Sequence, residues 1–90
     1  MPKGLIGDSV NFNCTSDTQI RFWYKLDSSN NPILINNATE NRFYIFNTQL
    51  SVNLYQSILN IDSVNQADFA YYECFDSKFN YAGSNFTKKG

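Results

Sequence analysis

The stretch QADFAYYECF, Gln66 to Phe75, repeats with a period of two near the end of the 90-residue chain. An acid, a small residue, a tyrosine and a cysteine occupy every second position, at Asp68, Ala70, Tyr72 and Cys74. A period of two is that of a β-strand, whose successive side chains point to opposite faces of a sheet. The stretch therefore predicts a strand with these residues on one face and the intervening residues on the other.

Similar alternation continues through the rest of the chain, interrupted by short polar turns. The segment SVNFNC places Val10, Phe12 and Cys14 on one face, and QIRFWYKL is rich in residues that favour strands. Further strands are predicted at Ile33 to Ile35, Arg42 to Phe46, Tyr55 to Val64 and Ser84 to Lys88. Helical spacing is confined to about one turn near Asn65 to Asp68. About six to eight short strands separated by turns predict an all-β sandwich or barrel.

Composition limits the chain to one small globular domain. Ninety residues leave no room for a second core, and 42% hydrophobic residues favour a packed domain over a disordered one. We therefore expect residues 1–90 to form a single domain. A net charge of −1 gives no electrostatic footprint for nucleic acid or an anionic membrane, so neither is an expected partner. Any targeting or anchoring segment is expected to lie outside this chain.

The two cysteines, Cys14 and Cys74, allow two interpretations. A disulfide between them would close a long loop and could stabilise the fold by ~4 kcal/mol. Two separate buried thiols are the alternative, and they are common in cytosolic proteins. A zinc site is not expected, because the chain has no histidine and such sites usually need four nitrogen or sulfur ligands. No metal or cofactor is therefore expected.

Catalysis has little support in the sequence. Histidine is absent, the serines have no visible base, and no pair of acids stands at a recognisable catalytic spacing. We expect that the protein is not an enzyme. Several carboxylates could supply oxygens to calcium, but none lies in a loop with ligand spacing. Solvated surface charge is the expected state of Asp17, Asp27, Glu40, Asp62 and Asp76.

One cysteine on an early strand, a tryptophan on the next and the pattern from Asp68 to Cys74 resemble the immunoglobulin superfamily. The resemblance extends from GDSVNFNC at 7–14 through FWYK at 22–25 to LNIDSVNQADFAYYEC at 59–74. It implies an immunoglobulin-like Greek-key β-sandwich of two antiparallel sheets, bridged by a disulfide between the two cysteines. The short connection between Trp23 and Arg42 favours an intermediate-type (I-set) or shortened variable-type (V-set) domain.

The resemblance assigns structural roles to several residues. Trp23 would pack against the disulfide, and Tyr72 would form a tyrosine corner through a hydrogen bond from its hydroxyl to the backbone. Asp68 resembles the acid that pairs with an arginine, for which Arg42 is the candidate. Arg21 departs from the pattern, since the family usually has an apolar residue there. Either a bulge redirects this side chain or the strand edge is open.

The residues between the inward-facing positions predict a binding face. If Trp23, Tyr72 and Cys74 point inward, their sequence neighbours point outward on two strands that the family places side by side. The predicted partner-binding residues are Phe22, Tyr24, Ile33, Ile35, Tyr71, Glu73, Phe75, Phe79 and Tyr81. Exposed aromatic patches usually mark interaction sites. The alternative is that loops or the last strand cover several of these rings.

Three N-x-[ST] sequences, at Asn13, Asn37 and Asn85, are candidate glycosylation sites. Chance alone gives roughly as many in a chain so rich in asparagine, so their number decides nothing. Asn37 lies in a polar loop and is the best candidate acceptor. Asn13 adjoins the core cysteine and is a weaker one.

The resemblance implies a protein-recognition or cell-adhesion domain of a larger secreted or cell-surface receptor, invertebrate recognition receptors included. Its partner would be another protein or a second copy of the chain, and a membrane would be reached only through an anchor outside these residues. Two alternatives remain open. One is a structural domain of an intracellular array with reduced cysteines, and the other is a carbohydrate-binding sandwich whose aromatic residues stack on sugars.

Overall fold

The structure, a computed structural model, describes residues 3–36 and 41–89, in which strands are the main secondary structure. The strands are β1 (Lys3–Gly4), β2 (Val10–Ser16), β3 (Ile20–Leu26), β4 (Pro32–Ile35), β5 (Phe43–Ser51), β6 (Leu54–Ile61), β7 (Tyr71–Asp76), β8 (Tyr81–Asn85) and β9 (Thr87–Lys88). A single turn of 3-10 helix, η1 (Gln66–Asp68), precedes β7. The predicted all-β class is confirmed, as is the helical turn near Asn65 to Asp68.

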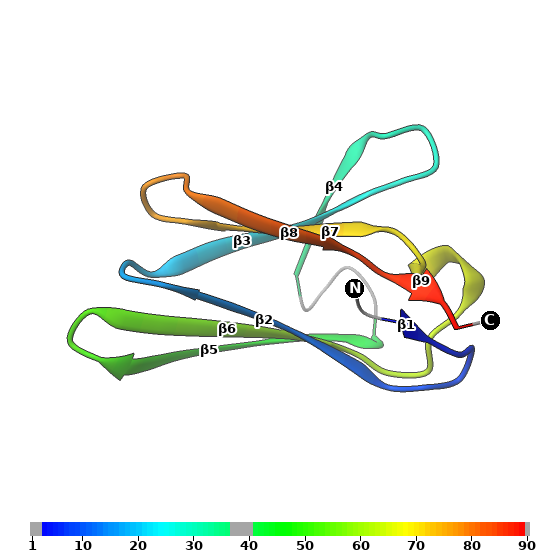
Figure 1. Cartoon of the computed structure of the whole chain (residues 1–90), viewed down its shortest axis with the longest axis horizontal. Helices are drawn as coiled ribbons and strands as arrows, with labels where there is room; N and C mark the ends of the chain where they lie inside the picture. The colour runs from blue at the N-terminus through cyan, green and yellow to red at the C-terminus, as the bar shows by residue number, and fades with distance from the viewer. Residues whose placement is uncertain (1–2, 37–40, 90) are drawn as a thin grey trace.

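The strands form three sheets, two of them antiparallel and larger than the third (Figure 1). One has the order β2-β6-β5 and the other the order β4-β3-β7-β8. Figure 1 shows these two sheets as layers, one below the other. The short strands β1 and β9 pair in parallel near the two chain ends. Among the described residues, no helix has the length and apolar character needed to cross a membrane.

The core lies where the inward faces of the two larger sheets meet. Alternate side chains are buried on β2, β6 and β7, among them Phe12 and Cys14 on β2, and Tyr72 and Cys74 on β7. Apolar residues of β6 and the following turn complete the core at Leu59, Ile61 and Val64. The alternation expected from the sequence is therefore present on these strands, and it decides which side chains remain available outside.

A disulfide between Cys14 and Cys74 joins β2 of one sheet to β7 of the other, with 6.6 Å between the two Cα atoms. Trp23 stands opposite Cys74 in the β3–β7 pairing and is buried. Its indole Nε1 donates a hydrogen bond of 2.8 Å to the hydroxyl of Ser57, the partner of Cys14 in the β2–β6 pairing. The alternative of two separate buried thiols is therefore excluded. A disulfide indicates an oxidising environment, such as the extracellular one.

A second set of interactions is centred on Asp68, whose carboxylate is buried. The guanidinium of Arg42 donates to both of its oxygens, at 2.7 Å and 3.2 Å. One of these oxygens also accepts from the backbone amide of Asn65 at 2.8 Å, which caps η1. The hydroxyl of Tyr72 donates to the carbonyl of Asp68 at 2.7 Å. The arginine, the acid and the tyrosine named in the sequence therefore meet at one corner.

The structure differs from the predicted strands at several ends. The strand predicted to end at Phe46 continues to Ser51 as β5, and the strand predicted to end at Val64 stops at Ile61 as β6. The last strand was expected at Ser84 to Lys88, but β8 begins earlier, because a short turn reverses the chain after β7. Phe86 interrupts the strand pairing and buries its ring in the core. Of the two alternatives for Arg21, the structure shows the bulge. It lies between Ile20 and Phe22, and with it Ile20 is buried and the Arg21 side chain is exposed.

Candidate binding face on the four-stranded sheet

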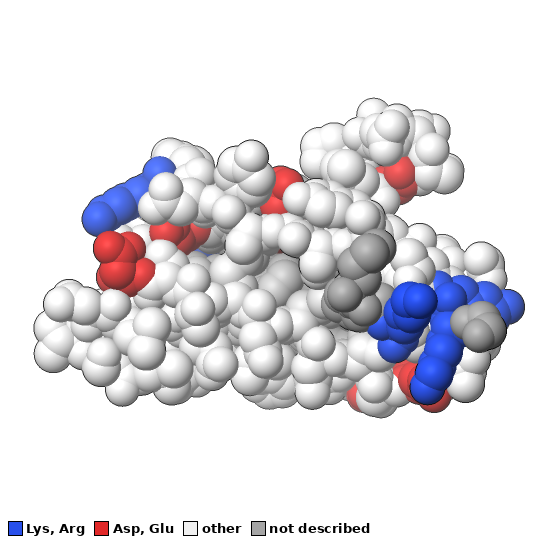
Figure 2. Space-filling model, viewed as in Figure 1, with Lys and Arg blue, Asp and Glu red and all other residues white. Residues whose placement is uncertain are grey.

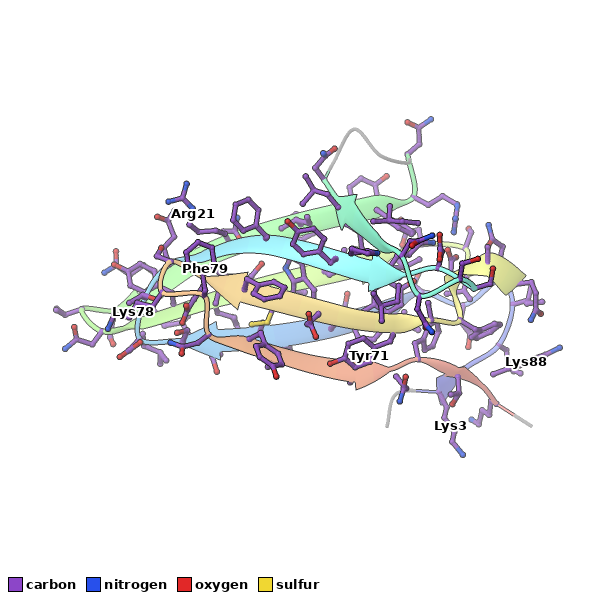
Figure 3. The ribbon with its side chains drawn as sticks, turned by 90° about the horizontal axis from the view of Figure 1, so that it is seen from above. Lys3, Arg21, Tyr71, Lys78, Phe79 and Lys88 are labelled. Carbon is purple, nitrogen blue, oxygen red and sulfur yellow. A yellow bond between two sulfur atoms is a disulfide. The ribbon has the colours of Figure 1, made fainter. Side chains whose placement is uncertain are left out.

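Aromatic side chains from three strands form a continuous row on the outer face of the four-stranded sheet. The rings of Phe22 and Tyr24 on β3 are 6.2 Å apart, centroid to centroid. Tyr24 meets Phe75 of β7 edge to face at 5.5 Å, and Phe75 meets Tyr81 of β8 at 5.8 Å. Figure 3 looks onto this sheet, with Phe79 at the turn between β7 and β8. We call this surface the aromatic face, formed by Phe22, Tyr24, Tyr71, Phe75, Phe79 and Tyr81.

An open groove of about 480 Å³ runs along the aromatic face. It is lined by Phe22, Tyr24, Lys25, Leu26, Pro32, Tyr71, Glu73, Phe75 and Phe79. Its walls are mostly apolar, with a few polar groups to orient a bound group, which is the usual make-up of a binding site. The groove has room for side chains of a partner that docks on the sheet.

Tyr71 is fixed on this face by a glycine and a carboxylate. Its ring lies across Gly83 of β8, where a Cβ atom would overlap the ring, so the position accepts only glycine without movement of Tyr71. The Tyr71 hydroxyl donates to Glu73 at 3.0 Å. Burial and this hydrogen bond raise the pKa of Tyr71 above its ordinary value. A lone glycine inside a strand signals such a close approach, although its partner cannot be read from the sequence.

The predicted face needs a correction on β4. Ile35 was expected to point outward, but it is only 2% exposed and belongs to the core. Residues opposite each other on paired strands point to the same side. Ile35 pairs with inward-pointing Trp23, and Ile33 shares its side, opposite Lys25. Leu34, opposite Tyr24, and Pro32, opposite Leu26, are the exposed β4 residues on the outer side.

Asp76 organises the turn between β7 and β8. One carboxylate oxygen accepts from the backbone amides of Lys78 and Asn80, at 2.8 Å and 3.0 Å. The other accepts from the hydroxyl of Ser16 at 2.6 Å and from the side chain of Asn80 at 3.1 Å. The Ser16 hydroxyl above all, with the Asn80 and backbone donors, holds the pKa of Asp76 far below its usual range. The expectation that Asp76 is a solvated surface charge is wrong, because it is 2% exposed.

This turn holds Phe79 in a left-handed backbone conformation, with φ of 62°. The segment DSKFN at 76–80 shares its pattern with DSSNN at 27–31, where Asp27 caps the turn in the same way. The matching position there is Asn30, also with φ of 62°. Asparagine tolerates this conformation well, whereas a bulky aromatic residue adopts it at a cost. Phe79 nevertheless leaves its ring 75% exposed, so burial of the ring does not offset the cost of this conformation.

The described candidate glycosylation sites lie on different sheets. Asn13 is exposed on β2 of the three-stranded sheet. Asn85 is exposed at the end of β8, opposite Tyr71, and therefore adjoins the aromatic face. Asn37 lies outside the described residues, as does the acid Glu40.

Carboxylates considered for calcium are engaged elsewhere. Asp27 and Asp76 cap turns, Asp62 accepts from the Ser9 hydroxyl at 2.8 Å, and Asp17 lies 3.9 Å from the Lys78 ammonium. Within residues 3–36 and 41–89, no group of three or more acids or cysteines is placed to hold a metal ion.

No protein-family model matches the chain, and no curated protein matches it significantly. The function therefore has to be inferred from the geometry of the aromatic face. That geometry offers apolar contact area, tyrosine hydroxyls and the carboxylate of Glu73 along one groove.

Phe79→Asn is expected to raise the free energy of unfolding by about 1 kcal/mol. Asparagine adopts the left-handed backbone conformation at lower cost than phenylalanine, and little packing is lost because the Phe79 ring is exposed. Asn30→Phe makes the reverse change in the matching turn and is expected to lower stability by about as much. Urea unfolding of both variants measures the effects. A clear loss of stability in Phe79→Asn would show that packing of the ring outweighs the strain.

Asp76→Asn is expected to lower stability by a constant amount near neutral pH and by less in acid. Because the pKa of Asp76 is depressed in the folded state, its contribution is complete above the unfolded-state value. The contribution is lost progressively as the pH falls below about 4. Unfolding measured from pH 2 to 7 should show the two proteins converging in acid. A difference independent of pH would contradict this role of the carboxylate.

Proposed function

We propose that this chain is an immunoglobulin-like β-sandwich domain that recognises another protein through its aromatic face. The disulfide between the two larger sheets, the buried Trp23 beside it and the corner formed by Tyr72 and Asp68 support the fold assignment. The four-stranded order β4-β3-β7-β8 is compatible with an intermediate-type or shortened variable-type domain. On this proposal it is one domain of a larger secreted or cell-surface protein, and it has no enzymatic role.

The observation that carries the proposal is the row of outward rings that ends at Phe79 and Tyr81. These two side chains are 75% and 67% exposed, and they continue a surface that is already apolar. Aromatic residues supply much of the binding energy at protein interfaces, where they fill pockets on the partner. A rigid sheet supports the inner rings, so little ordering would be needed on binding.

The relative orientation of the rings favours a protein partner over a sugar. Neighbouring rings on the aromatic face are inclined by 46°, 89° and 39°, so they form an uneven relief rather than a flat platform. Such relief suits interdigitation with side chains of another protein. The disulfide supports a secreted or cell-surface location over an intracellular array with reduced cysteines.

The first partner to test is a second copy of the chain. The groove carries the carboxylate of Glu73 among its apolar walls, whereas the Lys25 ammonium points to the inner side, toward the Ala67 carbonyl and the Phe43 ring. A two-fold arrangement brings the same patch of each copy together, so that the exposed rings of one copy can pack against those of the other.

Tyr81→Glu is expected to weaken self-association at least tenfold, about 1.4 kcal/mol, because it places a charge among the contacting rings. Tyr44→Glu is the matched control, since Tyr44 is an exposed tyrosine on the opposite sheet. Sedimentation velocity of the unglycosylated chain over a range of concentrations measures both. Equal association by Tyr81→Glu and the unmodified chain would contradict the proposed face. A chain that stays monomeric throughout would exclude the homophilic partner.

A further inference from the structure

The three strands β2, β5 and β6 contain no lysine, arginine, aspartate or glutamate. In Figure 2 the lower left of the molecule, over β5 and β6, is accordingly white. Two aromatic residues of β5 are exposed on the outer face of this sheet, Tyr44 at 41% and Phe46 at 56%. Their rings are nearly parallel, inclined by 21° with centroids 6.5 Å apart. Unlike the aromatic face, this surface offers two nearly parallel rings and no charge.

The sequon Asn13-Cys14-Thr15 lies on β2, an edge strand of the same sheet. Asn13 stands opposite Ile58 of β6, and Ile58 stands opposite Phe46 of β5, so the three residues form one row across the sheet. Two strand spacings place the Phe46 backbone about 10 Å from that of Asn13. Asn13 and Thr15 are exposed on the outer side, while Cys14 points to the disulfide on the inner side. The adjoining cysteine therefore does not obstruct a group attached to Asn13.

We propose that Asn13 carries an N-linked glycan whose first sugars lie across Ile58 and stack on Phe46 and Tyr44. The inference rests on the secretory setting of the proposed function, but not on which face binds protein. In the modification, the Asn13 side-chain nitrogen attacks the anomeric carbon of an oligosaccharide on a lipid diphosphate donor. A C–N bond forms, the C–O bond to the diphosphate breaks, and the diphosphate leaves with the electron pair. The amide loses one proton to a base of the oligosaccharyltransferase.

The chemistry of this face matches a neutral sugar. The faces of aromatic rings are electron-rich and attract the weakly positive C–H bonds of a sugar ring. Around the two rings stand amide and hydroxyl side chains that can both donate to and accept from sugar hydroxyls. These surrounding residues are Asn11, Thr15, Thr48 and Gln56. An attached glycan is held close to the rings by its covalent bond, so even weak stacking would be populated.

A glycan at Asn13 would also distinguish the two sheets. It would cover the outer face of β2-β6-β5 and leave the aromatic face on the other sheet open. Asn85 differs in this respect, because it stands opposite Tyr71, so a glycan there would lie beside the aromatic face. Of the two described sequons, Asn13 is therefore the one whose occupancy is compatible with protein binding.

The test is to secrete the 90-residue chain from a eukaryotic cell line behind a cleavable signal peptide. Peptide N-glycosidase converts an occupied asparagine to aspartate, so peptide mass spectrometry reports occupancy at Asn13. Thr15→Ala removes the sequon and keeps Asn13, whereas Asn85→Gln is the control for the other sheet. Stacking is then tested by comparing the Tm of the glycosylated and Thr15→Ala proteins, each with Phe46 intact and with Phe46→Ser.

We expect occupancy at Asn13 and a Tm that falls by about 4 °C or more in Thr15→Ala, with most of that fall absent in the Phe46→Ser background. An unmodified Asn13 in the secreted, folded protein would overturn the proposal. A Tm difference of equal size in both backgrounds would overturn the stacking on Phe46. Self-association of the Thr15→Ala protein is measured separately, so loss of protein binding cannot be mistaken for failure of the glycan site.

Discussion

The disulfide between Cys14 and Cys74 is the constraint on which the arrangement of this small domain depends. It fixes one inward position on β2 and one on β7, in different sheets, and Trp23 adds a hydrogen bond to Ser57 beside it. Because side chains alternate along a strand, the inward direction of Cys74 sends its neighbours outward. Glu73 and Phe75 thus line the groove as a consequence of how the core is closed.

The two outer faces of the domain have different chemistry. On the four-stranded sheet, inclined rings and a glutamate line a groove, and the turn centred on Asp76 presents Phe79 beside it. On the three-stranded sheet, the strands carry no charge and two nearly parallel rings share the surface with amides and hydroxyls. Interleaving side chains suit the first surface, and a covalently attached sugar suits the second. One domain can in this way hold a covered side and a binding side.

Much of this organisation could be predicted from the sequence, because it follows from local alternation. The period of two around Tyr72 and Cys74 predicts both the buried set and the outward set on β7. The error at Ile35 has a different origin. The register of β4 against β3 depends on the length of the connecting turn, and a shift of one residue moves every side chain to the other face.

Other features depend on contacts that no local pattern specifies. The burial of Asp76 requires the Ser16 hydroxyl, which comes from the opposite sheet. Arg21 is turned outward by a bulge. The only sign of this bulge in the sequence is that a charged residue stands two positions before Trp23, where strict alternation would point it inward. The backbone conformation of Phe79 could have been suspected from the shared pattern of DSSNN and DSKFN, since both begin with an aspartate that caps the turn.

Amide chemical shifts of the ¹⁵N-labelled, unglycosylated chain, followed as its concentration is raised, would show which sheet forms the contact. Binding through the aromatic face predicts progressive shifts at residues such as Tyr24, Phe75 and Gly83 on β3, β7 and β8. Residues of β2, β5 and β6 should keep their positions. Shifts confined to β2, β5 and β6 would contradict the proposed binding face.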